Sequence, residues 1–128
     1  MLDEAGKYLK FLGREGFDLR LGELSHLPVR DRETDCVVIN MVLHYLDDPS
    51  IAIAEAGRII RNGGRLVIAE LESHGDESLR SNYGHRWLGF STDTVKNWIS
   101  ANGFSFKKLK KFPAAKDLNV VLYVSEKI

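Results

Sequence analysis

The sequence lacks a glycine-rich phosphate loop. It has 11 glycines, but no two of them are separated by a single residue, so no Gly-x-Gly pair occurs. Loops that hold dinucleotides or phosphates use glycines at that spacing, because only then can the backbone approach the phosphates closely. Serine is present, but never within a Gly-x-Ser-x-Gly nucleophile turn. These absences exclude a phosphate loop of this kind within the sequence and lead us to reject a serine-hydrolase triad.

Cysteine, long apolar runs and an excess of one charge are also scarce. The single cysteine, Cys36, cannot form an internal disulfide, which fits a reduced cytoplasm, and we interpret it as a buried apolar filler. Lys plus Arg and Asp plus Glu number 18 each, so no global field attracts nucleic acid or an anionic membrane. No apolar run reaches the length of a membrane span, and the opening MLDEAGKYLK carries charges where an export signal needs an apolar core. We therefore expect a cytoplasmic protein without nucleic-acid or membrane partners.

What the sequence does contain is the pattern of one α/β domain over residues 1–128. Short apolar or alternating runs predict strands, and apolar residues recurring every three or four positions between capping residues predict helices. In chain order we expect a helix at Leu2–Leu12, strands at Phe17–Gly22 and Cys36–Ile39, a helix from Asp48-Pro49 to Asn62-Gly63-Gly64, a strand at Leu66–Leu71, a helix from Ser91 to Gly103, and strands at Phe104–Phe112 and Leu118–Val124. The last two strands predict an antiparallel hairpin. The whole order predicts an α/β sheet with helices on its faces.

Polar side chains occur where two of the buried strands end. Asn40 and His44 follow the strand Cys36–Ile39, and the segment Glu70–His74 ends the next strand. Ligands of open α/β sheets bind beyond the carboxyl ends of the strands, so these side chains can line a crevice. They can equally well hydrogen-bond loop backbone. Placement alone does not decide between the two interpretations.

Glu70, Glu72 and His74 could also be interpreted as metal ligands. Alternate residues of an extended segment face the same way, and a carboxylate-rich set suits a hard or borderline cation. However, their spacing matches no zinc signature and no cysteine is nearby to help. We favour a solvated strand end and expect no metal site.

The long polar segment Glu72–Gly89 contains a further aromatic cluster. Trp87 and Phe90 lie close in sequence to His85 and could form a wall or lid over the crevice. The alternative, which we favour, is that Trp87 anchors a long loop to the core.

Three stretches of the sequence together resemble a known family. They are LRLGELSHLPVRD, DCVVINMVLHYLDDPSIAIAEAGRIIRNGGRLVIAEL and GHRWLGFSTDTVKNWISANGF, running from about Asp18 to Phe104. The combination resembles class I S-adenosylmethionine-dependent methyltransferases. The Gly-His-x-Trp-Leu-Gly-Phe piece is similar to bacterial methyltransferase domains fused behind an arsenical-repressor-type winged helix. The resemblance implies a Rossmann-like sheet with helices on both faces, S-adenosylmethionine as cofactor and a small-molecule methyl acceptor.

The resemblance also implies cofactor contacts for individual residues. Glu23 and Leu24 occupy the family's adenine-contacting position, although the family usually has aspartate where this sequence has Glu23. Asn40 and Met41 correspond to the strand end that touches the methionine portion of the cofactor.

The substrate side of the implied pocket begins at His44. Methyl transfer from a sulfonium needs mainly the alignment of acceptor and methyl group with water excluded. A general base helps only if the acceptor has a proton to lose, and His44 and His85 are the candidates for that role.

Relative to the family, the sequence lacks the first two strands, the glycine-rich loop and the acidic end of the second strand. We therefore expect the carboxyl-terminal part of a methyltransferase domain, inactive alone, with a non-catalytic binding or dimerisation module of the same fold as the alternative. The absent strands would lie between Asp18–Leu21 and Cys36–Asn40, and their absence would expose a strand edge. We expect the short strand to pair directly beside Cys36–Asn40, or strands to be exchanged in a homodimer.

Overall fold

The computed structural model describes residues 1–128 apart from the side chain of Lys116. Its helices are α1 (Leu2–Phe11), α2 (Pro49–Ile59), α3 (Ser78–Tyr83) and α4 (Thr92–Ala101), with short 3₁₀ turns η1 (Leu43–Tyr45) and η2 (Ala115–Asp117). Its strands are β1 (Thr34–Asn40), β2 (Ile60–Leu71), β3 (Phe104–Pro113) and β4 (Asn119–Lys127). Within the described chain, no helix combines the length and the apolar character that crossing a membrane requires.

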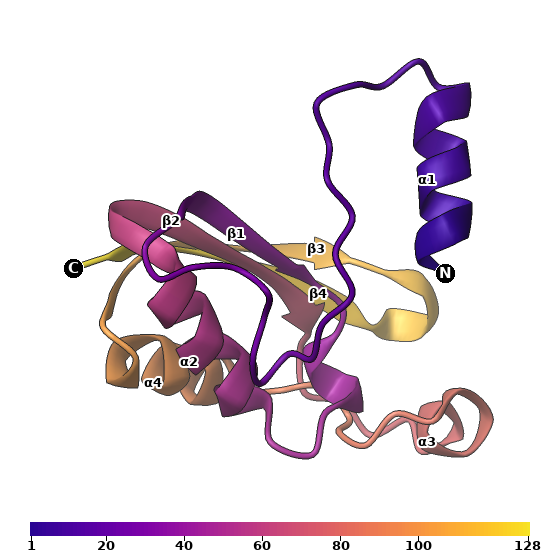
Figure 1. Cartoon of the computed structure of the whole chain (residues 1–128). Coiled ribbons are helices and arrows are strands. Elements are labelled where there is room, and N and C mark those ends of the chain that lie inside the picture. The colour runs from indigo at the N-terminus through magenta and orange to yellow at the C-terminus, as the bar shows by residue number, and fades with distance from the viewer.

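The strands form one mixed sheet in the order β1-β2-β4-β3 (Figure 1). β1 and β2 are parallel and are connected through α2, whereas β2 with β4 and β4 with β3 are antiparallel. A parallel pair needs such a crossover connection, and an antiparallel pair can be joined by a short loop such as η2. The α/β class and the hairpin at the end of the chain are therefore confirmed.

One face of the sheet is covered by α2 and α4 (Figure 1). Both helices begin at the predicted capping residues, since the side chains of Asp48 and Ser91 each accept a hydrogen bond from a backbone N–H of the first turn. The strand positions beneath the helices are closely packed: Ile68 and Tyr123 are 0% and 1% exposed. This face of the sheet therefore contains the hydrophobic core. Burial of each side chain of this size contributes roughly 1.5–3 kcal/mol to the stability of the fold.

The opposite face of the sheet has no helical cover in the described part of the chain. Its side chains are apolar as well: Val38 on β1 is in register with Val67 on β2, which is in register with Val124 on β4. Val38 is 64% exposed. α1 has no buried residue and stands beside the sheet rather than on it (Figure 1). The helical cover expected on both faces is thus observed on one face only.

The expected strand at Phe17–Gly22 is wrong. The segment is irregular and belongs to no strand of the described sheet. Leu19 instead faces α1, where a Cβ added to Gly6 would lie 3.2 Å from its Cδ1 atom. Alternating apolar residues indicate a half-buried surface, but they form a strand only where a neighbouring strand supplies hydrogen bonds.

The free edge of β1 follows from the same observation. In the described sheet β1 pairs with β2 alone, so its other edge carries no neighbour. The expectation that the short strand closes the gap beside Cys36–Asn40 is therefore wrong. Strand exchange between two copies stays a prediction, because it concerns a second chain.

Cys36 also differs from expectation, because it is exposed. It lies two residues before Val38, and residues two apart on a strand point to the same face. Its side chain therefore belongs to the uncovered face of the sheet. The interpretation of Cys36 as a buried filler is wrong for this reason.

The turn after α2 is tighter than the sequence indicates. The helix ends at Ile59 and β2 begins at Ile60, so the expected stop at Asn62-Gly63-Gly64 is wrong by three residues. These glycines instead lie within an irregularity of the β1–β2 pairing, where Gly63 has a φ of 79°. A Cβ on Gly64 would lie 2.7 Å from the carbonyl oxygen of Asp35, so only glycine fits there.

Candidate active site

The parallel strands β1 and β2 end at the same edge of the sheet, which brings the polar residues after them together. Asn40, the last residue of β1, is exposed and in register with Ala69 of β2. Met41 follows with a φ of 56°, and its N–H donates to the carbonyl oxygen of Ala69 at 2.9 Å. Residues other than glycine rarely adopt this conformation, and such strain clusters at functional sites. The geometry favours the crevice interpretation for this strand end.

The centre of the site is a buried contact between His44 and Glu70. Nδ1 of His44 lies 2.6 Å from Oε1 of Glu70, and the two side chains are 3% and 1% exposed. The carboxylate also accepts the backbone N–H of His44 at 3.3 Å and that of Leu71 at 2.8 Å. A buried carboxylate is stable only when its oxygens are hydrogen-bonded in this way. The ring of His44 therefore binds a side chain rather than loop backbone.

His85 comes from the segment between β2 and α4 and lies against His44, with their ring centroids 4.1 Å apart. The backbone N–H groups of Arg86 and Trp87 both donate to the carbonyl oxygen of His44, at 2.9 and 3.1 Å. The indole N–H of Trp87 donates to the carbonyl oxygen of Leu46 at 2.8 Å. These contacts fasten the segment to η1, so the structure favours Trp87 as an anchor rather than as a lid.

Burial makes His85 a weak base. The pKa of its imidazole is lowered mainly by burial and next by electrostatic repulsion from the neighbouring imidazole of His44, with Glu70 raising it and His74 lowering it to smaller extents. Its Nδ1 atom is buried and has no hydrogen-bond partner in the described part of the protein. His85 is therefore neutral near pH 7.

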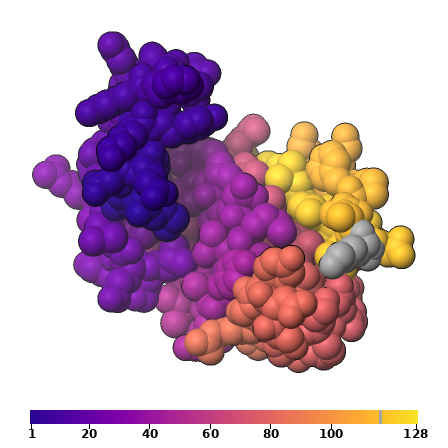
Figure 2. Space-filling view, turned by 90° about the vertical axis from the view of Figure 1, so that its right-hand side faces the viewer, coloured from indigo at the N-terminus to yellow at the C-terminus, as the bar shows by residue number. Residues whose placement is uncertain are grey.

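Two exposed tyrosines border the buried pair. Tyr45 is 45% exposed, and its ring lies 4.3 Å from that of His44 and 5.0 Å from that of His85. Tyr83, the last residue of α3, is 62% exposed, with its ring 6.4 Å from that of His85. Figure 2 shows the salmon α3 region on this side of the molecule, and a recess between the magenta part of the chain and the indigo N-terminal segment. The exposed tyrosines thus offer an aromatic surface to a ligand, whereas the buried pair of His44 and Glu70 offers hydrogen bonds.

The residues expected to contact adenine lie on the segment before β1. Glu23 is exposed and forms an isolated bridge with His26. Leu24 packs against the core and lines a cavity of about 220 Å³ together with Leu46 and Ile51. The structure therefore brings Leu24 to the chain that follows η1. It shows no hydrogen bond in the described chain from Glu23 to the end of β1.

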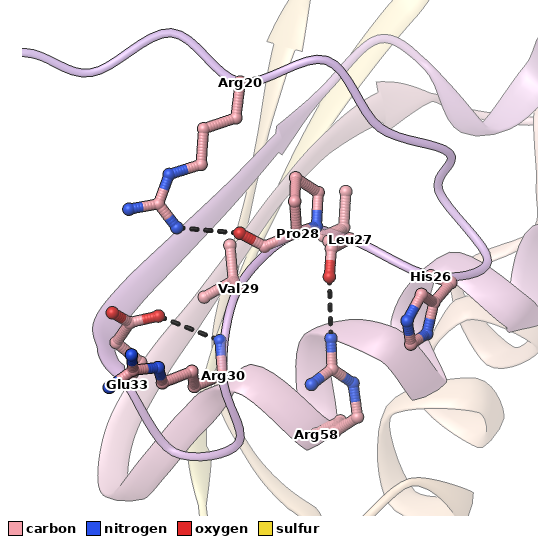
Figure 3. Close-up of a pocket in the computed structure, with 8 residues that line it drawn as sticks. All are labelled: Arg20, His26, Leu27, Pro28, Val29, Arg30, Glu33 and Arg58. Atoms are coloured by element: carbon pink, nitrogen blue, oxygen red, sulfur yellow. Dashed lines mark hydrogen bonds between the residues drawn. The ribbon is translucent and has the colours of Figure 1, made fainter.

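A larger cavity of about 460 Å³ lies elsewhere, at the amino end of β1 (Figure 3). Arg20 and Arg58 line it and donate to the carbonyl oxygens of Pro28 and Leu27, at 2.7 and 3.0 Å. Arg58 is also paired with Glu55, which is the main reason that the pKa of its guanidinium is raised. These arginines are already paired, and they lie at the amino end of β1 rather than at the carboxyl ends of the strands, where α/β sheets bind ligands. We therefore interpret the cavity as the place where the segment before β1 is fastened to α2.

The three residues weighed as metal ligands are not brought together. Glu70 faces the core, Glu72 pairs with Lys111, and Nδ1 of His74 accepts the backbone N–H of Asp76 at 3.1 Å. No group of three possible metal ligands converges among the residues that the structure describes. Each side chain has its own separate role.

Glu70 is the residue of the site whose role sequence reasoning missed. It lies at a core-facing position of an apolar strand, two residues after the fully buried Ile68. A carboxylate at such a position needs a hydrogen-bonding partner, since an unpaired buried charge is very costly. A glutamate at a buried strand position therefore predicts a polar partner nearby. That partner is His44, which follows the neighbouring strand.

Comparison with known sequences connects this geometry to a family. A family model described as a methyltransferase domain matches residues 1–68. The demethylmenaquinone methyltransferase of Thermobifida fusca is 40% identical over 87 residues, which are 68% of this chain and 35% of that enzyme. The chain therefore spans about a third of this curated relative.

Solved structures agree on the fold. A protein from Bacillus halodurans C-125 described as a methyltransferase matches with a TM-score of 0.83 at 14% identity, covering 98% of this chain and 78% of that one. A geranyl diphosphate methyltransferase solved in complex with S-adenosylmethionine matches with a TM-score of 0.80 at 12% identity, covering 99% and 64%. At these identities the likeness establishes the fold alone, and it confirms the Rossmann-like methyltransferase sheet. The kinship with arsenical-repressor-fused domains stays a prediction.

Proposed function

Because the chain belongs to the methyltransferase domain family, we propose that its site serves S-adenosylmethionine-dependent methyl transfer to a small-molecule acceptor. One observation carries the proposal: the family match over residues 1–68 includes the end of β1, where the strained Met41 follows the exposed Asn40. Family likeness and an unusual polar strand end thus coincide at the edge of the sheet where α/β proteins bind ligands.

The residues present fit one part of the cofactor. When bound, S-adenosylmethionine supplies a methyl group activated by its sulfonium. Asn40 would donate its side-chain amide to the methionine portion beside Met41, Leu24 would pack against the adenine, and Glu23 would accept from the exocyclic amine. The sequence has no Gly-x-Gly loop for the methionine end. We therefore propose that these 128 residues bind the cofactor weakly and have no turnover by themselves.

The histidines would serve the acceptor. His44 and His85 lie in contact at the end of the sheet, and either could take a proton from an acceptor that has one to lose. Tyr45 borders them with an exposed ring, which would help to exclude water and to align the acceptor.

Nuclear magnetic resonance with S-adenosylhomocysteine tests the cofactor proposal, because the method detects millimolar binding. We expect the backbone amide signals of Asn40 and Met41 to shift on titration, with smaller shifts at Leu24. Asn40→Ala should weaken binding by about fivefold or more, as expected for the loss of a hydrogen bond. Asn62→Ala, in the turn at the opposite end of β2, is the matched control and should leave binding unchanged.

The contrary outcome is clear in this experiment. If the end of β1 shows no shifts at saturating nucleoside, or if both asparagine variants bind alike, the cofactor is not held where we propose.

A second candidate function, an assembly module derived from the same fold, is favoured by a specific observation. The edge of β1 has no strand neighbour in the described sheet, and Val38 beside it is 64% exposed. An unpaired strand edge next to an apolar surface recruits a partner. Two copies that pair edge to edge through β1 would satisfy the free backbone groups and place Val38 beside the side chains of the partner strand.

Light scattering tests the assembly module. We expect a homodimer, and we expect Val38→Lys to convert it to a monomer because the charge lies on the uncovered face. Ile51→Lys places the same change on the outer surface of α2, where Ile51 is 44% exposed, and should leave the dimer intact. A monomeric parent protein at all concentrations would remove this candidate.

A further inference from the structure

The hydrogen bonds around Glu70 distinguish between the two candidate bases. Oε1 of Glu70 lies within hydrogen-bond distance of Nδ1 of His44 and accepts the backbone N–H of Leu71, and Oε2 accepts the backbone N–H of His44. An ionised carboxylate can only accept hydrogen bonds. With Glu70 ionised, Nδ1 of His44 is the donor in the 2.6 Å contact and carries a proton.

A neutral imidazole with its proton on Nδ1 has its lone pair on Nε2. Nε2 of His44 has no hydrogen-bond partner in the described chain, yet it is not among the fully buried unpaired atoms. The side chain of His44 is 3% exposed, so the ring lies at the edge of the buried region. His85 differs, since its Nδ1 is fully buried and has no hydrogen-bond partner among the residues that the structure describes.

We propose that Glu70 is a positioning residue that fixes the proton of His44 on Nδ1, so that Nε2 of His44 is the proton-accepting atom of the site and the methyl acceptor is a hydroxyl or N–H group. This inference rests on the proposed function and deepens it, because it names the class of acceptor. Groups that are methylated without losing a proton would gain nothing from such a pair.

The proposed step balances in atoms and charge. The O–H or N–H bond of the acceptor would break, and its proton would move to Nε2 of His44. The electron pair left on oxygen or nitrogen would form the new bond to the methyl carbon supplied by the cofactor, and the pair of the broken carbon–sulfur bond would stay on sulfur. The imidazolium formed on His44 is then stabilised by the Glu70 carboxylate that already contacts it.

The surroundings of His44 suit a transient cation. The titratable groups that face it are Glu70 from β2, Tyr45 from η1 and His85 from the segment before α4, with His74 and Tyr83 farther out. Burial lowers the pKa of His85 and keeps that ring neutral, so a protonated His44 would not meet a second charged imidazole. The exposed ring of Tyr45 adds a surface against which a planar acceptor can lie.

Long-range ¹H–¹⁵N spectra of the histidine rings test the assignment without any cofactor. In the parent protein at neutral pH we expect His44 to show a proton on Nδ1 and an unprotonated Nε2. Glu70→Gln should change this pattern, because its amide group is a donor and turns either towards Nδ1 or towards a backbone N–H.

Glu55→Gln is the matched control for loss of a buried carboxylate. Glu55 is 6% exposed and accepts hydrogen bonds from Leu27 and Arg58, far from the strand ends. This variant should leave the spectrum of His44 unchanged. The proposal is overturned if the parent protein shows the proton on Nε2, an outcome that does not depend on the folding of any variant.

A small-molecule probe tests the class of acceptor. 4-Nitrophenol should bind beside His44 and absorb as phenolate below the pH at which the free compound ionises, whereas 4-nitroanisole, which has no proton to lose, should bind more weakly. Glu70→Gln should reduce the phenolate signal by about tenfold or more, as expected for a hydrogen bond to a charged group. No phenolate signal, or equal binding of the two compounds, would overturn the proposal.

These results separate the inference from the proposed function. Shifts at Asn40 with S-adenosylhomocysteine report the cofactor, whereas the ring spectrum of His44 and the phenolate signal report the proton acceptor. A protein that passes the first test and fails the others is a methyltransferase domain without this pair. The reverse result would leave a proton-accepting site on a fold that does not bind the cofactor.

Discussion

The two faces of the sheet are built from the same strands but differ in cover. Ile39 and Val38 are neighbours on β1, yet their exposed fractions are 8% and 64%. The face of Ile39 is covered by α2 and α4, and the face of Val38 has no helix over it in the described chain. The comparison teaches that β1 has apolar side chains on both of its faces, as strands buried on both sides do. In this chain only one of the two faces is covered.

The covered face also holds the buried pair of the candidate active site. Glu70 points to the same side of β2 as Leu66 and Ile68, because residues two apart on a strand share a face. The buried pair of Glu70 and His44 is thus an extension of the core, held by the same packing. The uncovered face offers a surface for association instead.

Matched truncations on β2 give the largest expected effect. Ile68 is 0% exposed and its neighbour Val67 is half-buried on the other face. We expect Ile68→Ala to lower the free energy of unfolding by about 2–5 kcal/mol, because it leaves a cavity in the core. Val67→Ala should cost about 1 kcal/mol or less. Urea unfolding measures both values.

This pair of variants can also break the comparison. If both truncations cost the same large amount, the second face is buried in solution, and a partner copy is covering it. In that case the loss for Val67→Ala should shrink on dilution, because the stability of an associating protein depends on its concentration.

The parts of the fold that the sequence predicted depend on local patterns. The caps at Asp48 and Ser91 and the closing hairpin follow from residues close together in the chain, and all three are confirmed. The segment Phe17–Gly22 has a strand-like alternation, but whether it joins a sheet depends on a neighbour elsewhere. The cover of each face depends on tertiary packing as well, which is why helices were expected on both faces and are observed on one.

The site also has a part that the sequence predicts and a part that depends on tertiary structure. Asn40 and His44 could be located from the sequence, because a polar residue after an apolar strand marks the strand end. The contact between His44 and Glu70 joins residues 26 positions apart and depends on the register of β1 against β2. No single-strand pattern contains that register, so Glu70 was weighed as a metal ligand and its real partner was missed.

A smaller effect concerns the pH dependence of the free energy of unfolding, to which the buried His85 contributes. His85 is buried and its pKa is lowered, so the unfolded chain takes up a proton on this residue before the folded protein does. The free energy of unfolding should therefore fall as the pH drops below about 6.5, by at most ~1.4 kcal/mol per pH unit for one proton. Thermal unfolding between pH 7 and pH 5 should show this slope flattened in His85→Phe.

The lowered pKa of Glu55 acts in a more acidic range, below about 4.5, because a carboxyl whose folded pKa is depressed loses its contribution only as it becomes protonated. An unchanged slope in His85→Phe would show that burial on this side does not govern the titration.

The smallest expected effect concerns α1, which stands beside the sheet. Leu9 is the apolar residue of its inner side, but it is only half-buried, and the helix has no buried residue. Leu9→Ala should therefore change the free energy of unfolding by less than about 1 kcal/mol, since little packing is lost and alanine favours the helix. A loss in the range expected for Ile68→Ala, measured by the same urea unfolding, would mean that α1 packs on the sheet in solution. The two faces would then be equal in cover, and the surface that we assign to association would not exist.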